Sequence, residues 1–506
     1  MQTFGAFLVS FLAASGLAAA NAPGGPGGHG RKLPVNPKTF PNEIRLKDLL
    51  HGSQKLEDFA YAYPERNRVF GGQAHLDTVN YLYRELKKTG YYDVYKQPQV
   101  HQWTRADQSL TLGGDSIQAS TMTYSPSVNV TAPLSLVSKL GCAEGDYSAD
   151  VKGKIALVSR GECSFAQKSV LSAKAGAVAT IVYNNVDGSL AGTLGGATSE
   201  LGPYSPIIGI TLAAGQDLVA RLQAAPTEVS LWIDSKVENR TTYNVIAQTK
   251  GGDPNNVVAL GGHTDSVENG PGINDDGSGV ISNLVVAKAL TRYSVKNAVR
   301  FCFWTAEEFG LLGSNYYVDN LSPAELAKIR LYLNFDMIAS PNYALMIYDG
   351  DGSAFNLTGP PGSAQIESLF ENYYKSIKQG FVPTAFDGRS DYEGFILKGI
   401  PAGGVFTGAE SLKTEEQARL FGGQAGVALD ANYHAKGDNM TNLNHKAFLI
   451  NSRATAFAVA TYANNLSSIP PRNATVVKRE SMKWTKREEP HTHGADTGCF
   501  ASRVKE

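Results

Sequence analysis

The sequence predicts an α/β protein built on a mixed, largely parallel sheet with helices on both faces and with a smaller β-rich domain inserted. After residue 235, short runs typical of buried strands alternate with amphipathic helical segments, as in parallel sheets covered by helices. Between residues 124 and 234 the texture changes to short apolar runs separated by Gly-rich turns. The length of 506 residues also exceeds what one hydrophobic core accommodates, so two or three domains are expected.

The bulk composition is that of a folded, globular protein. Apolar residues make up 42% of the chain and charged residues 18%, and the formal net charge is −1. A nucleic-acid-binding protein would carry a strong basic excess, so this class is excluded. After the N-terminal leader, no uninterrupted apolar stretch reaches the length of about 18 residues that a membrane span needs. We therefore expect no membrane span in the mature chain.

The first 20 residues have the pattern of a signal peptide. An apolar stretch of about 17 residues ends in small residues, and Ala18-x-Ala20 suits cleavage before Asn21. No Lys or Arg precedes the apolar run, so a retained anchor is the alternative. Residues 21–43 form a Gly/Pro-rich segment that could serve as a propeptide, and we expect residues 21–34 of it to be disordered. Residues 469–506 form a polar tail.

Sequons support export along a eukaryotic secretory route. The motif N-x-S/T accepts N-linked glycans in secreted proteins. It begins at Asn129, Asn239, Asn320, Asn356, Asn439, Asn465 and Asn473. We expect a secreted glycoprotein, with delivery to a vacuolar lumen as the alternative.

The four cysteines allow three pairings if all of them form disulfides. Cys142 and Cys163 are close in sequence and lie in the same inserted module, so we expect a disulfide between them. Cys302 lies within RFCFW, a buried-strand pattern, and is expected to be a packed thiol. Cys499 lies in the polar tail and is not assigned.

Helices and strands follow from the spacing of apolar residues. Amphipathic helices are expected over residues 44–62 and 72–90, and the segment 161–185 of the insert has the pattern of strand, helix and strand. The later elements are four buried strands around one amphipathic helix. The strands are VVALGG (257–262), AVRFCFWTA (298–306), LYLNFDMIA (331–339) and IPAGGVFTG (400–408), and the helix is GVISNLVVAKALTRY (279–293).

Polar side chains gather at the carboxyl ends of these strands, where doubly wound sheets bind ligands. His263 and Asp265 follow the first strand, Glu307 and Glu308 the second, and Asp336 the third. The turn GINDDGSG before the helix adds Asp275, and the segment NYHAKGD adds His434.

Two histidines with several carboxylates suit zinc, whereas calcium would prefer oxygen ligands alone. A single zinc ion with three protein ligands would leave some of these carboxylates without a metal to bind. Two zinc ions bridged by one carboxylate, roughly 3.5–4 Å apart, would use five residues. These five are His263, Asp275, Glu308, Asp336 and His434.

The neighbours Glu307 and Glu308 point to two different roles. Adjacent side chains diverge, so one acid can bind a metal while the other takes a proton from water and gives it to a leaving amine. Asp265 lies two residues beyond His263 along an extended chain, so it could accept the second imidazole N–H and orient that ring.

The motifs HTD, GINDDGSG, WTAEEFGLLGS, NFDM and NYHAKGD, in this order, resemble the co-catalytic zinc aminopeptidases, a family of zinc exopeptidases with a phosphorylase/hydrolase-like fold. Within it, the chain is similar to secreted fungal leucine aminopeptidases and to vacuolar aminopeptidase Y. The segment CSFAQKSVLSAKAGA resembles a protease-associated domain. The resemblance implies a catalytic domain over residues 44–123 and 235–468, interrupted by a protease-associated domain over residues 124–234.

The resemblance also implies a role for each metal ligand. His263 and Asp336 would hold one zinc, Glu308 and His434 the other, and Asp275 would bridge them. The peptide bond between Asp275 and Asp276 is expected to be cis.

Further roles follow from the same resemblance. Glu307 would be the general acid and base, Asp265 would orient His263, and Tyr433 would donate a hydrogen bond to the tetrahedral intermediate. Arg389 and Phe406 match positions around the pocket for the substrate's free amine and first side chain.

The sequence therefore predicts a monomeric, secretory-route zinc aminopeptidase that hydrolyses the first bond of peptides with a free N-terminus and releases hydrophobic residues such as leucine. A competing hypothesis is another zinc enzyme of the same clan, either a carboxypeptidase or a glutaminyl cyclase. A second is a non-catalytic, receptor-like binding protein. The intact set of five ligands and a base argues against the receptor-like protein.

Overall fold

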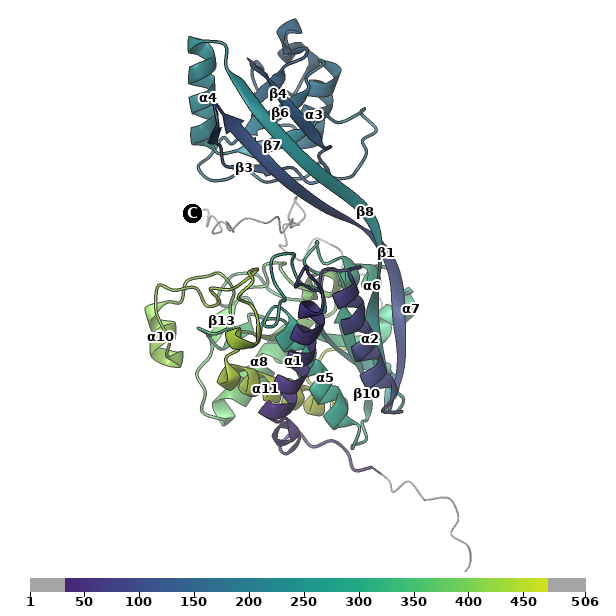
Figure 1. The fold of residues 1–506 in the computed structure, drawn as a ribbon. Coiled ribbons are helices and arrows are strands. Elements are labelled where there is room, and N and C mark those ends of the chain that lie inside the picture. The colour runs from purple at the N-terminus through teal and green to yellow at the C-terminus, as the bar shows by residue number, and fades with distance from the viewer. Residues whose placement is uncertain (1–31, 472–506) are drawn as a thin grey trace, which may run out of the picture.

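Two lobes joined by a long two-stranded ribbon make up the protein (Figure 1). The structure is a computed structural model, and it describes residues 32–471. The predicted signal peptide, the first part of the Gly/Pro-rich segment, the sequon at Asn473 and Cys499 lie outside the described residues.

The ribbon consists of β1 (Tyr92–Leu112) and β8 (Glu228–Thr249), paired antiparallel from Tyr92↔Thr249 to Thr111↔Ser230. At one end β8 pairs with β10 (Asn297–Trp304) of the larger lobe, and at the other end with β4 (Val128–Leu136) of the smaller lobe. A single sheet therefore runs through both lobes, and β8 is continuous across the expected domain boundary at residues 234 and 235.

The larger lobe is built on a mixed sheet in the order β13-β12-β14-β11-β9-β10-β8. Strands β10, β9, β11 and β14 are mutually parallel, β12 is antiparallel to β14, and β8 is antiparallel to β10. The remaining bounds are β9 (Asp253–His263), β11 (Ile329–Phe335), β12 (Met346–Tyr348), β13 (Val382–Thr384) and β14 (Ala402–Phe406). The predicted mixed, largely parallel sheet is confirmed.

Helices cover both faces of this sheet because successive strand residues point to opposite sides. Val258 and Leu260 pack into one apolar cluster, whereas Ala259 between them belongs to the other. The first face is covered by α1 (Leu46–Tyr61), α2 (Gln73–Lys87), α5 (Gly277–Leu290), α8 (Ser363–Ser376) and α11 (His445–Asn464). The second is covered by α6 (Leu312–Asp319), α7 (Pro323–Lys328) and α9 (Tyr392–Leu397). Helix α10 (Glu415–Phe421) projects from the lobe and buries no residue.

The smaller lobe combines strands and helices. Of the strand–helix–strand pattern expected over residues 161–185, the helix and the second strand are present, whereas the strand before the helix ends earlier, at Ser159. Strands β4, β5, β6 and β7 run parallel, and β3 pairs antiparallel with β7. The remaining elements are β2 (Asp115–Ser116), β3 (Ala119–Thr121), β5 (Ile155–Ser159), α3 (Phe165–Lys174), β6 (Ala179–Tyr183), β7 (Ile207–Ile210) and α4 (Leu212–Ala224).

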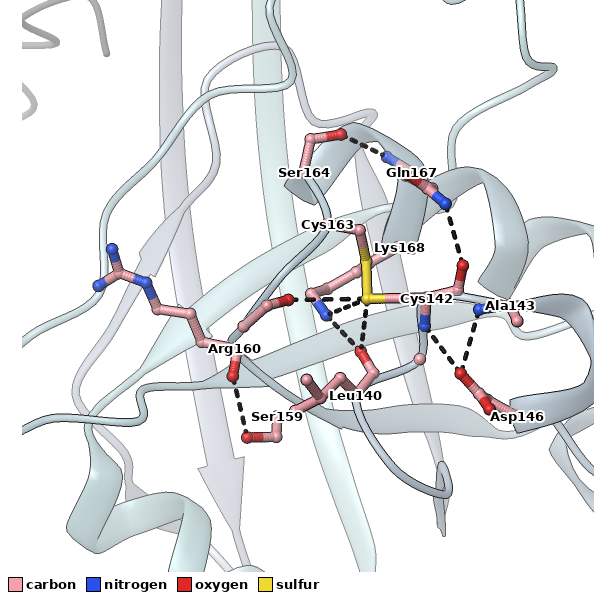
Figure 2. Close-up of a disulfide and its surroundings, with 12 residues drawn as sticks. Leu140, Cys142, Ala143, Asp146, Ser159, Arg160, Cys163, Ser164, Gln167 and Lys168 are labelled. Carbon is pink, nitrogen blue, oxygen red and sulfur yellow. Dashed lines mark hydrogen bonds between the residues drawn. A yellow bond between two sulfur atoms is a disulfide. The ribbon is translucent and has the colours of Figure 1, made fainter. Parts of the chain in front are cut away.

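A disulfide links Cys142 and Cys163 at the start of α3, which is the pair expected from the sequence (Figure 2). The Asp146 carboxylate accepts the backbone N–H groups of Cys142 and Ala143 at 2.9 and 3.1 Å, so the turn that begins at Cys142 is held by local hydrogen bonds. Cys302 is a buried free thiol in β10.

Five of the six sequon asparagines within residues 32–471 are exposed, and Asn439 is half-buried. The exposed ones are Asn129, Asn239, Asn320, Asn356 and Asn465. Within the same residues, no helix is both long and apolar enough to cross a membrane.

Candidate metal centre

The predicted ligands meet at one edge of the main sheet. His263 is the last residue of β9, Glu307 and Glu308 follow β10, and Asp336 follows β11. These strands are parallel neighbours, so their carboxyl ends lie side by side. Two further loops reach the same edge, one carrying Asp275 before α5 and one carrying His434 before α11.

The Asp275 carboxylate lies between the two imidazoles. Its Oδ1 atom is 3.1 Å from Nε2 of His263, and its Oδ2 atom is 3.2 Å from Nε2 of His434. A further carboxylate lies near the Nε2 atom of each histidine: Asp336 Oδ1 is 3.6 Å from His263 Nε2, and Glu308 Oε2 is 3.0 Å from His434 Nε2. The five side chains therefore form two donor sets that share one carboxylate.

These separations fit metal ligation. Zn–N and Zn–O bonds of about 2.0–2.1 Å in a tetrahedron place neighbouring donor atoms about 3.3 Å apart. Donor atoms of His263, Asp275 and Glu308 lie within 4.8 Å of one another. The same is true of donor atoms of His263, Asp276 and Asp336. Imidazoles combined with carboxylates favour zinc over calcium.

Burial gives a second reason to expect cations here. Asp275, Glu308 and Asp336 are 5%, 2% and 8% exposed, and the Oδ1 atom of Asp336 accepts no hydrogen bond from the described residues. Buried carboxylates this close to one another need positive charge. A pair of divalent ions held by the donor sets would supply it.

The pKa shifts of the site residues also indicate that the buried acids need positive charge nearby. Burial opposes ionisation of Asp275, yet hydrogen bonds from His263 and His434 hold the pKa of its carboxyl below the ordinary value. Burial disfavours imidazolium, but Glu307 and Asp336 raise the pKa of His263 well above its ordinary value. Glu308 and Asp275 likewise outweigh burial and raise the pKa of His434 to about 10.

Glu307 reaches the same space without joining either donor set. Its Oε2 atom is 3.8 Å from His263 Nε2, and the residue is 5% exposed. Burial raises the pKa of its carboxyl well above the ordinary value, and Glu308 raises it further, although His263 opposes the shift. A buried carboxyl whose proton affinity is raised suits proton transfer near neutral pH.

Asp265 lies behind His263. The Nδ1 atom of His263 is 3.3 Å from the Asp265 carbonyl oxygen and 3.7 Å from its carboxylate, so the carbonyl is the nearer partner of the ring. The carboxylate accepts the backbone N–H of Glu307 at 3.1 Å. Asp265 thus links the loop of His263 to the loop of Glu307.

Three of the loops bend through left-handed backbone conformations beside the site. Ala306 precedes Glu307 with φ of 54°, Met337 follows Asp336 with φ of 47°, and His434 itself has φ of 56°. Positive φ is uncommon for residues other than glycine and clusters at functional sites, where surrounding contacts hold it.

Sequence reasoning missed several residues that hold the ligands in place. Asp276, joined to Asp275 by the expected cis peptide bond, accepts the N–H groups of His263, Gly279 and Met337. The buried Asp438 carboxylate accepts the backbone N–H of Asp275 at 3.0 Å. Asp276 lies within the motif GINDDGSG and could have been considered from the sequence. The residues around Asp438, in contrast, do not indicate that its carboxylate binds the backbone of Asp275.

Two further contacts complete this support. Ser390 donates to Asp336 Oδ2 at 2.6 Å. The fully buried Arg68 donates to the carbonyl oxygens of Pro271 and Gly272, so its guanidinium fixes the loop that leads to Asp275.

A pocket opens beside the candidate metal ligands. Its lining includes the acids Glu307 and Asp336 together with Arg389, Phe406 and Tyr433. The Tyr433 ring stacks on His434 with 3.7 Å between centroids. All residues assigned from the sequence to metal, catalysis or substrate therefore come together, with Asp265 behind the ligands rather than in the pocket.

A mixed α/β sheet with two histidines and a set of acids at its carboxyl edge, beside a pocket, defines a metal-dependent hydrolase. Residues 244–459 match Peptidase family M28, and residues 130–218 match the PA domain. The chain is 76% identical over 501 residues to "Probable leucine aminopeptidase 2" of Aspergillus fumigatus, covering 99% of both chains. It is 71% identical over 481 residues to the "probable leucine aminopeptidase 2" of Aspergillus oryzae, covering 94% and 97%.

Solved structures agree with this family. An aminopeptidase from Aneurinibacillus sp. strain AM-1 is 28% identical with a TM-score of 0.66, covering 87% of this chain and 98% of its own. A zinc aminopeptidase from Bacillus subtilis is 25% identical with a TM-score of 0.60, covering 85% and 96%. The chain belongs to peptidase family M28 and carries an inserted PA domain. It is an aminopeptidase, as the sequence predicts.

Proposed function

We propose that two zinc ions serve this aminopeptidase, that Asp275 bridges them, and that the enzyme releases hydrophobic residues such as leucine from peptides with a free N-terminus. The observation that carries the proposal is the Asp275 carboxylate, whose two oxygens face different imidazoles at 3.1 and 3.2 Å. A bridging carboxylate has this disposition.

Each ion would have its own protein ligands. His263 and Asp336 would hold one zinc, and Glu308 and His434 the other. When bound, the pair would polarise the first peptide carbonyl and acidify a water molecule.

Side chains of the protein would transfer the proton and stabilise the negative charge that develops on the carbonyl oxygen. Glu307 would take the proton from the attacking water and pass it to the leaving amine. Tyr433 would donate a hydrogen bond to the carbonyl oxygen as negative charge develops there. Asp265 would hold His263 in register through the contacts of its carbonyl and carboxylate.

The charge around the pocket favours an amino-terminal substrate. Glu307 and Asp336 line it and would attract an ammonium group. A carboxypeptidase would need an available cation for a terminal carboxylate, but the Arg389 guanidinium is paired with Glu410 at 2.8 Å. Carboxypeptidase activity is therefore disfavoured.

The apolar part of the pocket supports a preference for hydrophobic residues. Phe406, Met337 and Ala409 line it together with Tyr348. Burial of an apolar side chain against this wall contributes about 25 cal/mol per Å². The relatives named leucine aminopeptidase agree with this preference.

The donor sets also disfavour a glutaminyl cyclase and a receptor-like protein. A glutaminyl cyclase typically keeps a single zinc, whereas two donor sets share Asp275 here. A receptor-like protein would have lost ligands, and this chain retains all five.

We also propose that the protein is a secreted, monomeric glycoprotein, divided into a catalytic domain over residues 44–123 and 235–468 and an insert over residues 124–234. The Cys142–Cys163 disulfide and the five exposed sequon asparagines support an oxidising, secretory route.

Hydrolysis of aminoacyl-p-nitroanilides by the purified protein tests the activity. We expect cleavage of leucyl-p-nitroanilide, no cleavage of its N-acetylated form, and two zinc ions per chain by plasma emission. Release of C-terminal residues from N-blocked peptides, or a content of one zinc at full activity, would overturn the proposal.

A further inference from the structure

Glu410 and Arg389 form a two-point ion pair at the pocket wall. Nη1 of Arg389 donates to Oε1 of Glu410 at 2.8 Å, and Nη2 donates to Oε2 at 3.2 Å. The side chains of Arg389 and Glu410 are 23% and 31% exposed. A bidentate pair fixes the plane of the guanidinium as well as its position.

The same guanidinium also contacts Tyr433. Nη2 of Arg389 donates to the Tyr433 hydroxyl oxygen at 3.3 Å. An arginine has only donors, so the phenol oxygen must be the acceptor and its own hydrogen must point elsewhere. Stacking on His434 holds the ring itself. The contacts thus fix both the place of the hydroxyl group and its role as a donor to a third group.

The three residues come from three separate loops. Arg389 precedes α9, Glu410 follows β14, and Tyr433 precedes His434. Arg389 and Tyr433 line the pocket that also contains Glu307 and Glu308. Glu410 lies outside every motif that points to catalysis, and it reaches Tyr433 through Arg389.

We propose that Glu410 is a positioning residue that, through Arg389, holds the Tyr433 hydroxyl as a preorganised hydrogen-bond donor to the oxygen of the scissile carbonyl. The cation beside the phenol oxygen strengthens its O–H as a donor. The Glu410 carboxylate keeps that cation from turning toward the acids of the metal centre. The inference rests on the proposed role of Tyr433 in hydrolysis.

Such a device acts on the transition state, because negative charge develops on the carbonyl oxygen only there. Loss of the Glu410 carboxylate should therefore lower kcat and leave KM nearly unchanged. If Glu410 instead only neutralised Arg389 toward the substrate's ammonium group, its loss would raise KM.

The test is a double-mutant cycle on the zinc-loaded, full-length enzyme with leucyl-p-nitroanilide. Glu410→Gln should lower kcat by about tenfold, and Tyr433→Phe by about 100-fold. In the Tyr433→Phe background, Glu410→Gln should change kcat by less than about twofold, because its effect passes through the lost hydroxyl. Glu410→Asp should recover part of the loss.

A binding measurement supplies a readout that does not depend on turnover. The boronic acid analogue of leucine mimics a tetrahedral centre, and its affinity by calorimetry should weaken with Glu410→Gln by the same factor as kcat/KM. The matched control is Glu416→Gln, since Glu416 is 69% exposed on α10. It should leave kcat, KM and analogue affinity unchanged.

Three outcomes would overturn the inference: an equal loss of kcat in both backgrounds, a rise in KM alone, or unchanged analogue affinity. Failure of the wild-type enzyme to cleave leucyl-p-nitroanilide would instead overturn the proposed function, so the two failures are distinguishable. Equal zinc content in all variants ties any change to Glu410 rather than to loss of metal.

Discussion

Nε2 of His434 lies 3.0 Å from Oε2 of Glu308, although 126 positions separate the two residues in the chain. The contact unites a loop after β10 with the loop before α11. It creates one of the two donor sets that share Asp275.

Removal of His434 should therefore cost one metal ion. We expect His434→Ala to reduce the zinc content from about two ions per chain to about one, measured by plasma emission, and to abolish most activity. His445→Ala, at an exposed position at the start of α11, serves as the control and should keep both ions. Two ions retained by His434→Ala would contradict the assignment. In the wild-type protein, chelation should remove activity and zinc should restore it.

Substitution of Glu307 should separate catalysis from metal binding. Glu307→Gln keeps the size of the side chain but cannot take up a proton, so kcat should fall by at least about 100-fold. Zinc content should not change, because Glu307 belongs to neither donor set. The measurement is initial rate alongside metal analysis, and nearly normal turnover would refute the assignment of the base.

Phe406 should influence the choice of substrate. Phe406→Ala removes apolar surface from the pocket wall, so kcat/KM for leucyl-p-nitroanilide should fall by about tenfold relative to alanyl-p-nitroanilide. Phe355→Ala is the control, since Phe355 is 44% exposed and does not line the pocket. An unchanged leucine-to-alanine ratio would place the specificity elsewhere.

His75 should make the folded state sensitive to acid. Burial, assisted by Arg68, lowers the pKa of this histidine to about 3, and its ring lies 2.8 Å from the Thr264 hydroxyl. The folded state therefore binds fewer protons than the unfolded state between pH 6.5 and about 3, so stability falls as pH falls through this window.

His75→Gln should flatten that dependence, because glutamine keeps hydrogen-bonding capacity without titrating. Urea unfolding of both proteins at pH 7.5, 6.0 and 5.0 measures the difference. The exposed His51 provides the control, and His51→Gln should follow the wild-type curve. Parallel curves for His75→Gln and the wild type would show that His75 titrates normally in the fold.

The disulfide should stabilise the smaller lobe alone. Cys142 and Cys163 are separated by 21 positions, and a loop of this size contributes about 3 kcal/mol. The double variant Cys142→Ser/Cys163→Ser should lower the melting temperature of that lobe in calorimetry. Activity on leucyl-p-nitroanilide is the internal control, and its loss would mean that the lobe supports the active site directly.

Much of the fold and site could be predicted because the signals are local. Strand β9 is an apolar run that ends at His263, and β10 ends just before Glu307. Polar residues at the ends of such strands predict a common site, because neighbouring parallel strands have their carboxyl ends at the same edge of the sheet.

The ribbon and the supporting residues could not be predicted in this way. The buried side of β1 changes along the strand: Tyr92 and Val94 are buried first, then Gln99 and Trp103, and then Leu110. The strand therefore lacks the single continuous alternation of apolar residues that marks a half-buried strand. Asp438 and Arg68 act on Asp275 and Gly272 from distant positions, and their residue types alone do not reveal those partners. Such contacts exist only once the loops have folded together.

The continuity of β1 and β8 has a consequence for engineering the protein. The two lobes are not joined by flexible linkers, because each of the two chain segments that connect them is a hydrogen-bonded strand. Any displacement of the smaller lobe must bend or twist that stem as a whole. Removing the insert would cut both strands in the middle and leave two unconnected strand ends. A truncated enzyme would therefore need a new turn that joins the remaining part of β1 to the remaining part of β8.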